Sequence, residues 1–496
     1  MAETIDVDYL IVGAGAMGLA FADTMLSDSK ATMAIVDRYH TPGGHWTVAY
    51  PFVRLHQPSA FYGVNSAPLG RDAVDQHGTN RGLYELATAH EVLAYYRQLL
   101  DRQFLPSGRV QYFPKCEYTG DGKFHAVLTS KTYQAGSKTK IVDATYMKVT
   151  VPSMAPPKYH VAAGVELVTP NELVTLKEGR SSYTVVGSGK TGIDTCLWLL
   201  GQGVPQDKIT WIMPRDAWLR DRESLQPGDL FGERRAGTLQ LMQRAAATCA
   251  SADDYLDQME QGGEAIRLSR DVRPASYRCA TVSVAELDAL RNISNVIRQG
   301  RVVSITADQV TLQHGAYTPQ PGALYVDCST DGLAKLPPVP VFQGRTLRLQ
   351  PVRPCQQVFS AAFIAHVEAT YGKNDDDDDD DDEAEALKNT LCRPVPHPNV
   401  PSDWLVTNIL HGRARALWLA YPQTRAWLAA SRLNFEKHWL PTDKAAREAL
   451  VAGGMSRERQ MQSNQLLHRL YGVLDTLPEE EAAAAKALIG DLPKME

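Results

Sequence analysis

Short apolar runs alternate with a helical pattern in two stretches of the chain. In the first, the apolar run Tyr9 to Val12 precedes a helical pattern over Ala16 to Leu26 and a second apolar run over Thr32 to Val36. The same order returns about 170 residues later, over residues 183–213. A strand, a helix and a second strand form a βαβ unit with a parallel sheet. The pattern therefore predicts an α/β fold with two Rossmann-like units.

The rest of the chain divides around these two units. Apolar positions at helical spacing predict a helical insertion at about 234–262, and from Trp404 to Leu477 the pattern is again helical. The run Leu324 to Ser329 is expected to be a strand that returns to the first unit. We predict a first unit over 1–165, a second over 166–320, a return to the first over 321–365, and a mostly helical C-terminal region over 386–496.

An acidic run interrupts the chain at residues 374–385. Asp375 to Glu383 supply nine negative charges, so the remaining chain carries +3 although the net charge is −6. Consecutive aspartates cannot be buried together, and we expect a disordered, solvated loop here. With that loop set aside, the charge gives no case for a nucleic-acid partner.

The sequence gives no sign of a membrane segment or of a metal site. No apolar stretch reaches the roughly 18 residues of a membrane-spanning helix, and the first residues lack the pattern of a signal peptide. Seven scattered cysteines form no C-x-x-C pair, which argues against a zinc site and against a disulfide framework. We therefore expect a cytoplasmic protein whose cysteines are buried thiols.

A glycine-rich turn follows the first predicted strand. Gly13, Gly15 and Gly18 form a G-x-G-x-x-G motif that opens the first predicted helix. Such glycines allow a tight turn, a close approach of backbone amides to a pyrophosphate, and close packing of helix on strand. Asp37 ends the next strand, where a carboxylate accepts hydrogen bonds from ribose hydroxyls and repels a 2′-phosphate. The motif predicts a site for a dinucleotide without a 2′-phosphate, and we include the neighbouring Arg38 in it.

A glycine pair and a tryptophan stand directly downstream. Gly43, Gly44 and Trp46 form the pattern G-G-x-W, in register with the glycine motif and Asp37. With these residues the chain resembles the class B flavoprotein monooxygenases, which include flavin-containing monooxygenases, N-hydroxylases and Baeyer–Villiger enzymes. The resemblance implies that the first unit binds FAD and that residues 38–60 lie along it, near the isoalloxazine ring. By itself, the G-G-x-W pattern equally fits an ordinary turn followed by a core tryptophan.

The second predicted unit carries a second glycine-rich turn. Gly187, Gly189 and Gly192 repeat the G-x-G-x-x-G spacing, and Thr191 stands where the family has serine. The next strand ends at Arg215, with Arg220 and Arg222 nearby in the sequence, and a guanidinium can bind a 2′-phosphate through two hydrogen bonds. We expect this site to prefer NADPH to NADH. The alternative is that these arginines are solvated surface charges.

The resemblance also implies a reaction. NADPH would reduce the flavin, and a flavin hydroperoxide formed with O2 would transfer one oxygen atom to a small organic substrate. Because the cofactor carries such chemistry, no catalytic triad is required. Arg54, His56 and Gln57 are the candidates to line the reactive face of the flavin, since the family match of the Tyr50-Pro51 segment puts them there. A histidine at its ordinary pKa changes charge near neutral pH; alternatively, His56 is a structural hydrogen-bonder. His411 is a weaker candidate.

Two departures from the family pattern keep other functions open. The fingerprint F-x-G-x-x-x-H-x-x-x-W/Y is absent, since Val168 and Glu172 stand at its histidine and aromatic positions. His56 replaces the aspartate of the Baeyer–Villiger run Y-P-G-A-R-C-D. One alternative is a flavin reductase or dehydrogenase on the same scaffold that inserts no oxygen.

A further alternative is a degenerate flavoprotein that acts through a protein partner. An apolar stripe on the last helices would favour it, although a helix docked on an ordinary core has the same spacing. The stripe consists of Leu466, Leu467, Leu470, Val473 and Leu474.

Overall fold

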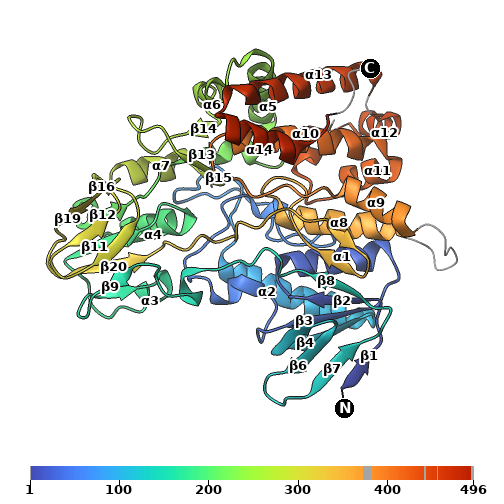
Figure 1. Ribbon diagram of the computed structural model, residues 1–496, viewed down its shortest axis with the longest axis horizontal. Coiled ribbons are helices and arrows are strands. Elements are labelled where there is room, and N and C mark those ends of the chain that lie inside the picture. Colours follow the sequence, from blue (N-terminus) through green and yellow to red (C-terminus); the bar gives the residue numbers. More distant parts are fainter. Residues whose placement is uncertain (1, 373–380, 441–442, 455, 493–496) are drawn as a thin grey trace.

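The structure, a computed structural model, describes residues 2–372, 381–440, 443–454 and 456–492 (Figure 1). Its first sheet has six strands in the order β21-β22-β8-β2-β3-β4. The strands from β22 to β4 are parallel, and β21 pairs antiparallel with β22 at one edge. The strands are β2 (Tyr9–Val12), β3 (Met33–Asp37), β4 (Val110–Pro114), β8 (Lys140–Asp143), β21 (Phe342–Gln343) and β22 (Thr346–Arg348).

Two buried helices connect this sheet to the rest of the molecule. α1 (Ala16–Asp28) follows β2, and α8 (Gln357–Tyr371) packs along it. Both helices are apolar on nearly all faces, which is typical of helices enclosed in a core. α2 (Ala89–Leu99) begins at a capping box formed by Thr88 and Glu91. A smaller sheet flanks this unit with β1 (Glu3–Ile5), β5 (Cys116–Gly120), β6 (Lys123–Ala126) and β7 (Thr132–Ala135).

The second unit is built on a five-stranded parallel sheet in the order β10-β20-β11-β12-β16. Its helices are α3 (Pro170–Leu173), α4 (Lys190–Gly201) and α7 (Val284–Arg291). The strands are β10 (Leu167–Val168), β11 (Ser182–Val186), β12 (Ile209–Ile212), β16 (Asn295–Ile297) and β20 (Ala323–Asp327). A second small sheet adds β9 (His160–Val161), β17 (Val302–Ile305), β18 (Val310–Leu312) and β19 (Gly315–Tyr317).

One predicted strand lies in the other sheet. The run 324–329 was expected to return to the first unit, but β20 pairs with β11 and β10 of the second. All five residues of β20 are buried, so the strand needs a position between two neighbours, and the second sheet offers it. The chain returns to the first sheet later, at β21 and β22, and β22 pairs with β8.

The predicted insertion and the C-terminal helices share a core. α5 (Gly232–Thr248) and α6 (Ala252–Gln261) occupy the stretch of the predicted insertion and pack on β13 (Ala217–Asp221), β14 (Ala265–Ile266) and β15 (Ser276–Val282). The apolar stripe lies on α13 (Arg457–Val473) and continues to Leu474, and its central residues are buried in this core. The stripe therefore docks a helix inside the molecule. α10 (Asp403–Ala420) and α14 (Glu479–Ile489) also contribute to this core, whereas α11 (Pro422–Ala430) packs in the first core and α12 (Lys444–Gly453) follows it.

Two expectations need correction. Of the predicted acidic loop, residues 374–380 lie outside the described residues, but 381–385 begin α9 (Asp381–Leu391), whose Leu391 is buried in the first core. Five cysteines are buried free thiols, as expected, but Cys279 and Cys355 form a disulfide with a Cα–Cα distance of 6.4 Å. The disulfide joins β15 to the segment before α8. The α/β fold with two Rossmann-like units and a helical C-terminal region is confirmed.

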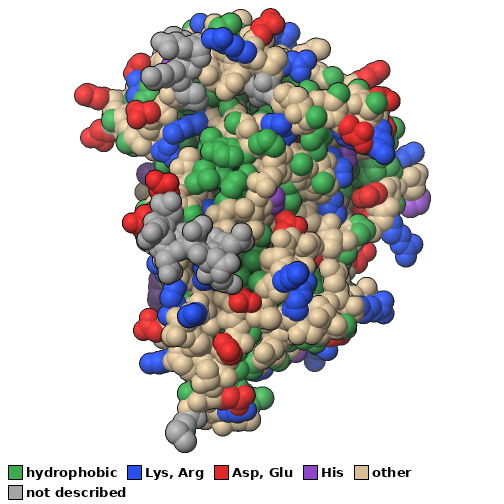
Figure 2. Space-filling model, turned by 90° about the vertical axis from the view of Figure 1, so that its right-hand side faces the viewer, with side chains coloured by type: hydrophobic (Ala, Val, Ile, Leu, Met, Phe, Trp, Pro, Cys, Tyr) green, Lys and Arg blue, Asp and Glu red, His purple; other side chains and the backbone are tan. Residues whose placement is uncertain are grey.

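The surface carries both signs of charge. On the face shown in Figure 2, Lys and Arg side chains are interspersed with Asp and Glu. Within the described residues, no helix is long and apolar enough to span a membrane.

Candidate functional site

The first glycine turn lies where β2 ends and α1 begins. Gly13 has φ +107°, and its amide donates to the Val36 carbonyl oxygen at 2.8 Å. A Cβ on Gly18 would collide with the Gly13 carbonyl oxygen, so the helix can pack this close to the turn only with glycine. Gly15 precedes the first residue of α1, so the amino end of the helix faces the space beyond the turn.

The Gly43-Gly44 pair packs directly on this turn. The Gly43 amide donates to the Ala14 carbonyl oxygen at 2.8 Å. Gly44 has φ +57°, and a Cβ there would lie 2.9 Å from the Cα of Gly15. The two glycine turns therefore approach each other backbone to backbone, which explains the G-G of the sequence pattern.

A cavity of about 470 Å³ opens beside these turns, which we call the glycine-turn cavity. Asp37 lies at its wall, buried, with its carboxylate accepting from the amides of Ala14 at 2.5 Å and Tyr39 at 2.7 Å. Burial raises the pKa of Asp37, and the two amides oppose that shift. Arg38 is exposed at the same cavity. A cavity with glycine turns, a helix amino end and a carboxylate fits the phosphates and ribose of a dinucleotide.

Trp46 points away from the glycine-turn cavity. Its ring is 7% exposed in the first core, and its Nε1 donates to the Tyr62 hydroxyl at 2.7 Å. His45, by contrast, lines the cavity, and burial lowers the pKa of His45 to about 4. The pattern G-G-x-W thus combines a turn that shapes the cavity with a tryptophan that anchors the turn in the core.

The second glycine turn lies where β11 ends and α4 begins. Gly187 has φ +125°, and a Cβ there would lie 2.5 Å from the Cys328 carbonyl oxygen. A Cβ on Gly192 would collide with the Gly187 carbonyl oxygen. A Cβ on Gly189 would meet nothing within 4 Å, so the space in front of this residue is open. Thr191 lies in the first turn of α4. The geometry repeats that of the first turn and fits a second dinucleotide.

Arg215 follows β12 and belongs to a cluster of three arginines. Burial lowers the pKa of Arg215, and the positive charges of Arg301 and Arg278 lower it further, while Asp331 opposes them. Arg278 contacts Asp331 at 3.5 Å. Arg215 therefore lies among further positive charges that Asp331 only partly offsets, a setting suited to an anion such as a 2′-phosphate.

Arg220 and Arg222 do not join this cluster, and they are not surface charges either. Arg222 is 2% exposed and pairs with Glu286 at 2.6 Å. Arg220 lies over the Trp404 ring, 3.8 Å from Glu264. The neighbours of Arg215 in sequence are thus held in the interior, and its neighbours in space come from β15 and from the residue before β17.

The segment that contains the catalytic candidates bridges the two units. The Tyr50 hydroxyl donates to Asp194 of α4 at 2.7 Å. The His56 carbonyl oxygen accepts from Arg222 Nε at 3.0 Å and from the Thr281 hydroxyl. Burial lowers the pKa of His56 to about 3, with contributions from the charges of Lys190 and Arg222. His56 is therefore neutral at pH 7, and the expectation of a charge change near neutral pH is wrong.

The other two candidates differ in their surroundings. Gln57 accepts from the amide of Gln356 at 2.9 Å, so it faces the start of α8. The next residue, Gln357, lines the glycine-turn cavity. Arg54 is exposed and pairs through its backbone with Thr88. The structure thus brings Gln57 close to the cavity and leaves the Arg54 side chain in solvent.

His411 belongs to a different cluster. It contacts the Glu436 carboxylate at 2.9 Å, and Arg353 and Arg415 contact the same carboxylate. Despite burial, His411 and Arg353 hold the pKa of Glu436 well below its usual range. This buried ion cluster joins α10 to the segment before α8 and has a structural role.

Several lining residues carry no sequence signal. Thr145, Met147 and Lys148 follow β8 and line the glycine-turn cavity. These residues follow the carboxyl end of β8, which lies parallel to β2 and next to it. Ligands bind at the carboxyl ends of parallel strands, so the sequence would have indicated these residues if the strand order had been known. Arg278 and Arg301 are distant in sequence from Arg215, and no spacing links them.

Comparison with known proteins gives relatives in mycobacteria. The chain is 48% identical over 442 residues to a protein of Mycobacterium tuberculosis and to one of Mycobacterium bovis, both described as uncharacterized. The matched segment covers 89% of this chain and 80% of each relative. No protein-family model matches the chain.

Solved structures that match more than two thirds of the chain include two monooxygenases. An open structure of cyclohexanone monooxygenase is 14% identical, with a TM-score of 0.47, and covers 78% of this chain and 92% of its own. A flavin-containing monooxygenase from Stenotrophomonas maltophilia is 16% identical, with a TM-score of 0.37, and covers 72% and 88%.

Proposed function

The chain belongs to the family of these mycobacterial proteins, and we propose that it is an FAD- and NADPH-dependent monooxygenase acting on a small organic molecule. The observation that carries the proposal is a pair of glycine turns with opposite charges beside them. The first turn has the Asp37 carboxylate, and the second has the Arg215 cluster. One cofactor site thus excludes a 2′-phosphate and the other favours it.

The glycine-turn cavity supports FAD as the first cofactor. Gly13, Gly15 and Gly44 leave backbone amides and open space where a pyrophosphate would lie, and Asp37 would accept hydrogen bonds from the ribose. The cavity continues to Gln357 at the start of α8, so a long ligand can extend along the first sheet. With FAD held there, the site would supply monooxygenase chemistry, in which NADPH and a proton provide the reducing equivalents, one oxygen atom of O2 enters the substrate and the other leaves as water.

The second turn supports NADPH as the electron donor. Gly189 would admit the pyrophosphate, and Arg215 with Arg301 would bind the 2′-phosphate. The contact between Tyr50 and Asp194 joins the segment after the first turn to the helix after the second. This connection supports a short path from one cofactor to the other.

The chain's own residues would bind and orient the cofactors and the substrate, and would exclude water from the site. Neutral His56, fixed by Arg222 and Thr281, would hold the bridging segment against the second unit. Gln57 would hydrogen-bond at the start of α8, near the reactive end of the cofactor. The exposed Arg54 would act only if substrate binding covers it.

One variant separates the two cofactor sites. Gly189→Leu fills the open space before α4 without a clash in the fold, so the protein should keep its flavin but no longer be reduced by NADPH. Gly201→Leu, at the other end of the same helix and also in open space, is the matched control. Flavin reduction by NADPH in the Gly189→Leu protein at the wild-type rate would refute the assignment.

Oxygen insertion is tested by the fate of the electrons. NADPH oxidation, O2 consumption and H2O2 release are measured across a panel of small organic compounds, and products are analysed after reaction under ¹⁸O2. The proposal requires at least one compound that gains one ¹⁸O atom while H2O2 release falls. H2O2 equal to NADPH consumed with every compound would favour a flavin reductase or oxidase on the same scaffold.

A further inference from the structure

A second cavity, of about 270 Å³, lies beside the glycine-turn cavity. Met147 lines both, so the two spaces adjoin. The walls come from residues 333–338, 350–351 and 394–399, and five of the lining residues are prolines. We call it the proline-rich pocket. Its volume is close to the lower end of the roughly 300–1,000 Å³ of ligand sites, so it suits a small molecule.

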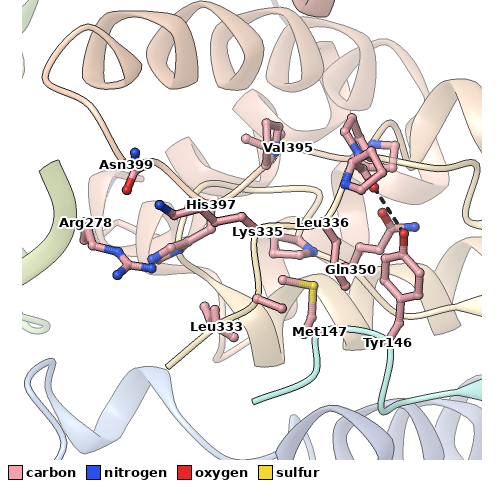
Figure 3. A pocket seen from close by; sticks show the side chains of 16 residues that line it. Tyr146, Met147, Arg278, Leu333, Lys335, Leu336, Gln350, Val395, His397 and Asn399 are labelled. Atoms are coloured by element: carbon pink, nitrogen blue, oxygen red, sulfur yellow. Dashed lines mark hydrogen bonds between the residues drawn. The ribbon is translucent and has the colours of Figure 1, made fainter. Parts of the chain in front are cut away.

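The proline-rich pocket has a polar end and an apolar end. Figure 3 shows Arg278, His397 and Asn399 together on one side, while Met147 and Leu336 lie toward the other. Lys335 is exposed and also lines the pocket, and none of the lining residues is acidic. A ligand that matches this arrangement has an apolar body and a negatively charged head.

Two polar atoms at the polar end lack partners within the protein. Nδ1 of His397 and Oδ1 of Asn399 are buried and make no hydrogen bond. Burial lowers the pKa of His397 to about 4, and the charge of Arg278 adds to this effect. His397 is therefore neutral at pH 7 and has one N–H to donate, and the Asn399 amide can present its NH2 group by rotation. Unpaired buried groups of this kind are expected where a ligand supplies the partner.

Arg278 has donors to spare. Its contact with Asp331 is 3.5 Å long, and Asp331 does not line the pocket. A guanidinium has five N–H donors in a planar fork that matches a carboxylate. A phosphate would fit less well, because one of the two cations that line the pocket, Lys335, is exposed, and only Arg278 is partly buried.

We propose that the proline-rich pocket binds the organic substrate, and that this substrate is a small apolar carboxylate held by Arg278, His397 and Asn399. The inference rests on the proposed function, since it takes the adjoining glycine-turn cavity to be the flavin site. The carboxylate end would lie beside β15 and the apolar end toward Met147, at the boundary of the two cavities.

Calorimetric titration of the flavin-loaded protein tests this assignment. The probes are hexanoate, hexan-1-ol, which has the same chain length without the charge, and inorganic phosphate, which has the charge without the apolar chain. Hexanoate should bind at least about tenfold more tightly than hexan-1-ol, because the charge-assisted hydrogen bonds require the carboxylate. Phosphate should not compete with hexanoate. Equal affinity for acid and alcohol, or displacement of hexanoate by phosphate, would overturn the proposal.

Three variants locate the binding. Arg278→Gln should weaken hexanoate binding about tenfold or more and leave hexan-1-ol unchanged. Arg270→Gln, an exposed position a few residues away, is the matched control and should change neither. Ala334→Phe, at a partly exposed wall residue, should block both probes without removing any charge. Hexanoate affinity that survives Arg278→Gln and Ala334→Phe would place the ligand elsewhere.

The result separates this inference from the proposed function. Protein that binds FAD and is reduced by NADPH but does not bind hexanoate refutes the pocket assignment alone. Protein that binds hexanoate through Arg278 but holds no flavin keeps the carboxylate site and refutes the monooxygenase.

Discussion

Replacement of Arg215 by glutamine should change the choice between NADPH and NADH. Arg215 lies at the carboxyl end of β12, where its pKa is lowered by burial and by the charges of Arg301 and Arg278. A hydrogen bond between ions contributes about 1.5–3 kcal/mol. Its loss should raise the KM for NADPH roughly tenfold to a hundredfold, while the KM for NADH stays unchanged because NADH has no 2′-phosphate.

The same cluster predicts the effect of this variant on stability. The three guanidinium groups repel one another, so removal of one charge should leave the Tm unchanged or raise it. A loss of NADPH binding therefore cannot be ascribed to unfolding. Arg270→Gln, exposed and outside the cluster, is the control for a change of net charge.

Steady-state rates of flavin reduction with each nucleotide, together with thermal unfolding, give both quantities. Equal changes in KM for NADPH and NADH, or no change in either, would show that Arg215 does not contact the 2′-phosphate. A large fall in Tm would refute the view that the charges of Arg301 and Arg278 repel Arg215.

Three further predictions concern the first unit and the ion cluster. Gly44→Ala should greatly reduce the amount of FAD that the protein retains, because φ is +57° and the new Cβ would lie 2.9 Å from the Cα of Gly15. Gly78→Ala, with φ +72° but open space around the new Cβ, is the control and should retain FAD. Flavin absorbance after gel filtration measures the retained FAD. Trp46→Phe should keep FAD and destabilise the fold by about 1–2 kcal/mol through loss of the Nε1 hydrogen bond, and loss of flavin would contradict the core assignment. Glu436→Gln should destabilise the protein by about 3 kcal/mol, because Arg353 stays buried without its carboxylate. Because folding lowers the pKa of Glu436, the ionised carboxylate stabilises the fold above the unfolded pKa near 4.5, and this stabilisation is lost as the pH falls. The free energy of unfolding, measured with denaturant at pH 7 and pH 4, should therefore differ less between the two pH values for the variant than for the wild type. An equal difference would exclude this role of Glu436.

The glycine turns were predictable because their signal is local. Gly13, Gly15 and Gly18 stand between an apolar run and a helical pattern. The close packing of the turn requires small residues at fixed intervals, so the spacing of the glycines alone identifies it. The structure places the same turn geometry at both predicted positions. Asp37 was predictable for the same reason, since the end of the second strand is fixed by the length of the βαβ unit.

The remaining features depend on distant contacts. Arg278 and Arg301 lie near Arg215 only because of how the strands of the second unit are arranged, which no local spacing indicates. The mostly apolar sequence of β20 fits a buried strand in either sheet, so it does not indicate which sheet the strand joins. The Cys279–Cys355 disulfide spans 76 residues and has no motif. The G-G-x-W pattern also does not indicate whether the Trp46 side chain faces the cavity or the core. In the structure its ring is buried in the core.

Anaerobic mixing of the FAD-loaded protein with NADPH tests the central claim most directly. We predict that the absorbance of oxidised flavin disappears in proportion to added NADPH, faster than with NADH, and that Gly189→Leu protein keeps its oxidised flavin under the same conditions. A wild-type flavin that NADPH does not reduce, or a purified protein that holds no flavin after incubation with FAD, would contradict the claim that the two glycine turns bind an electron donor and its acceptor.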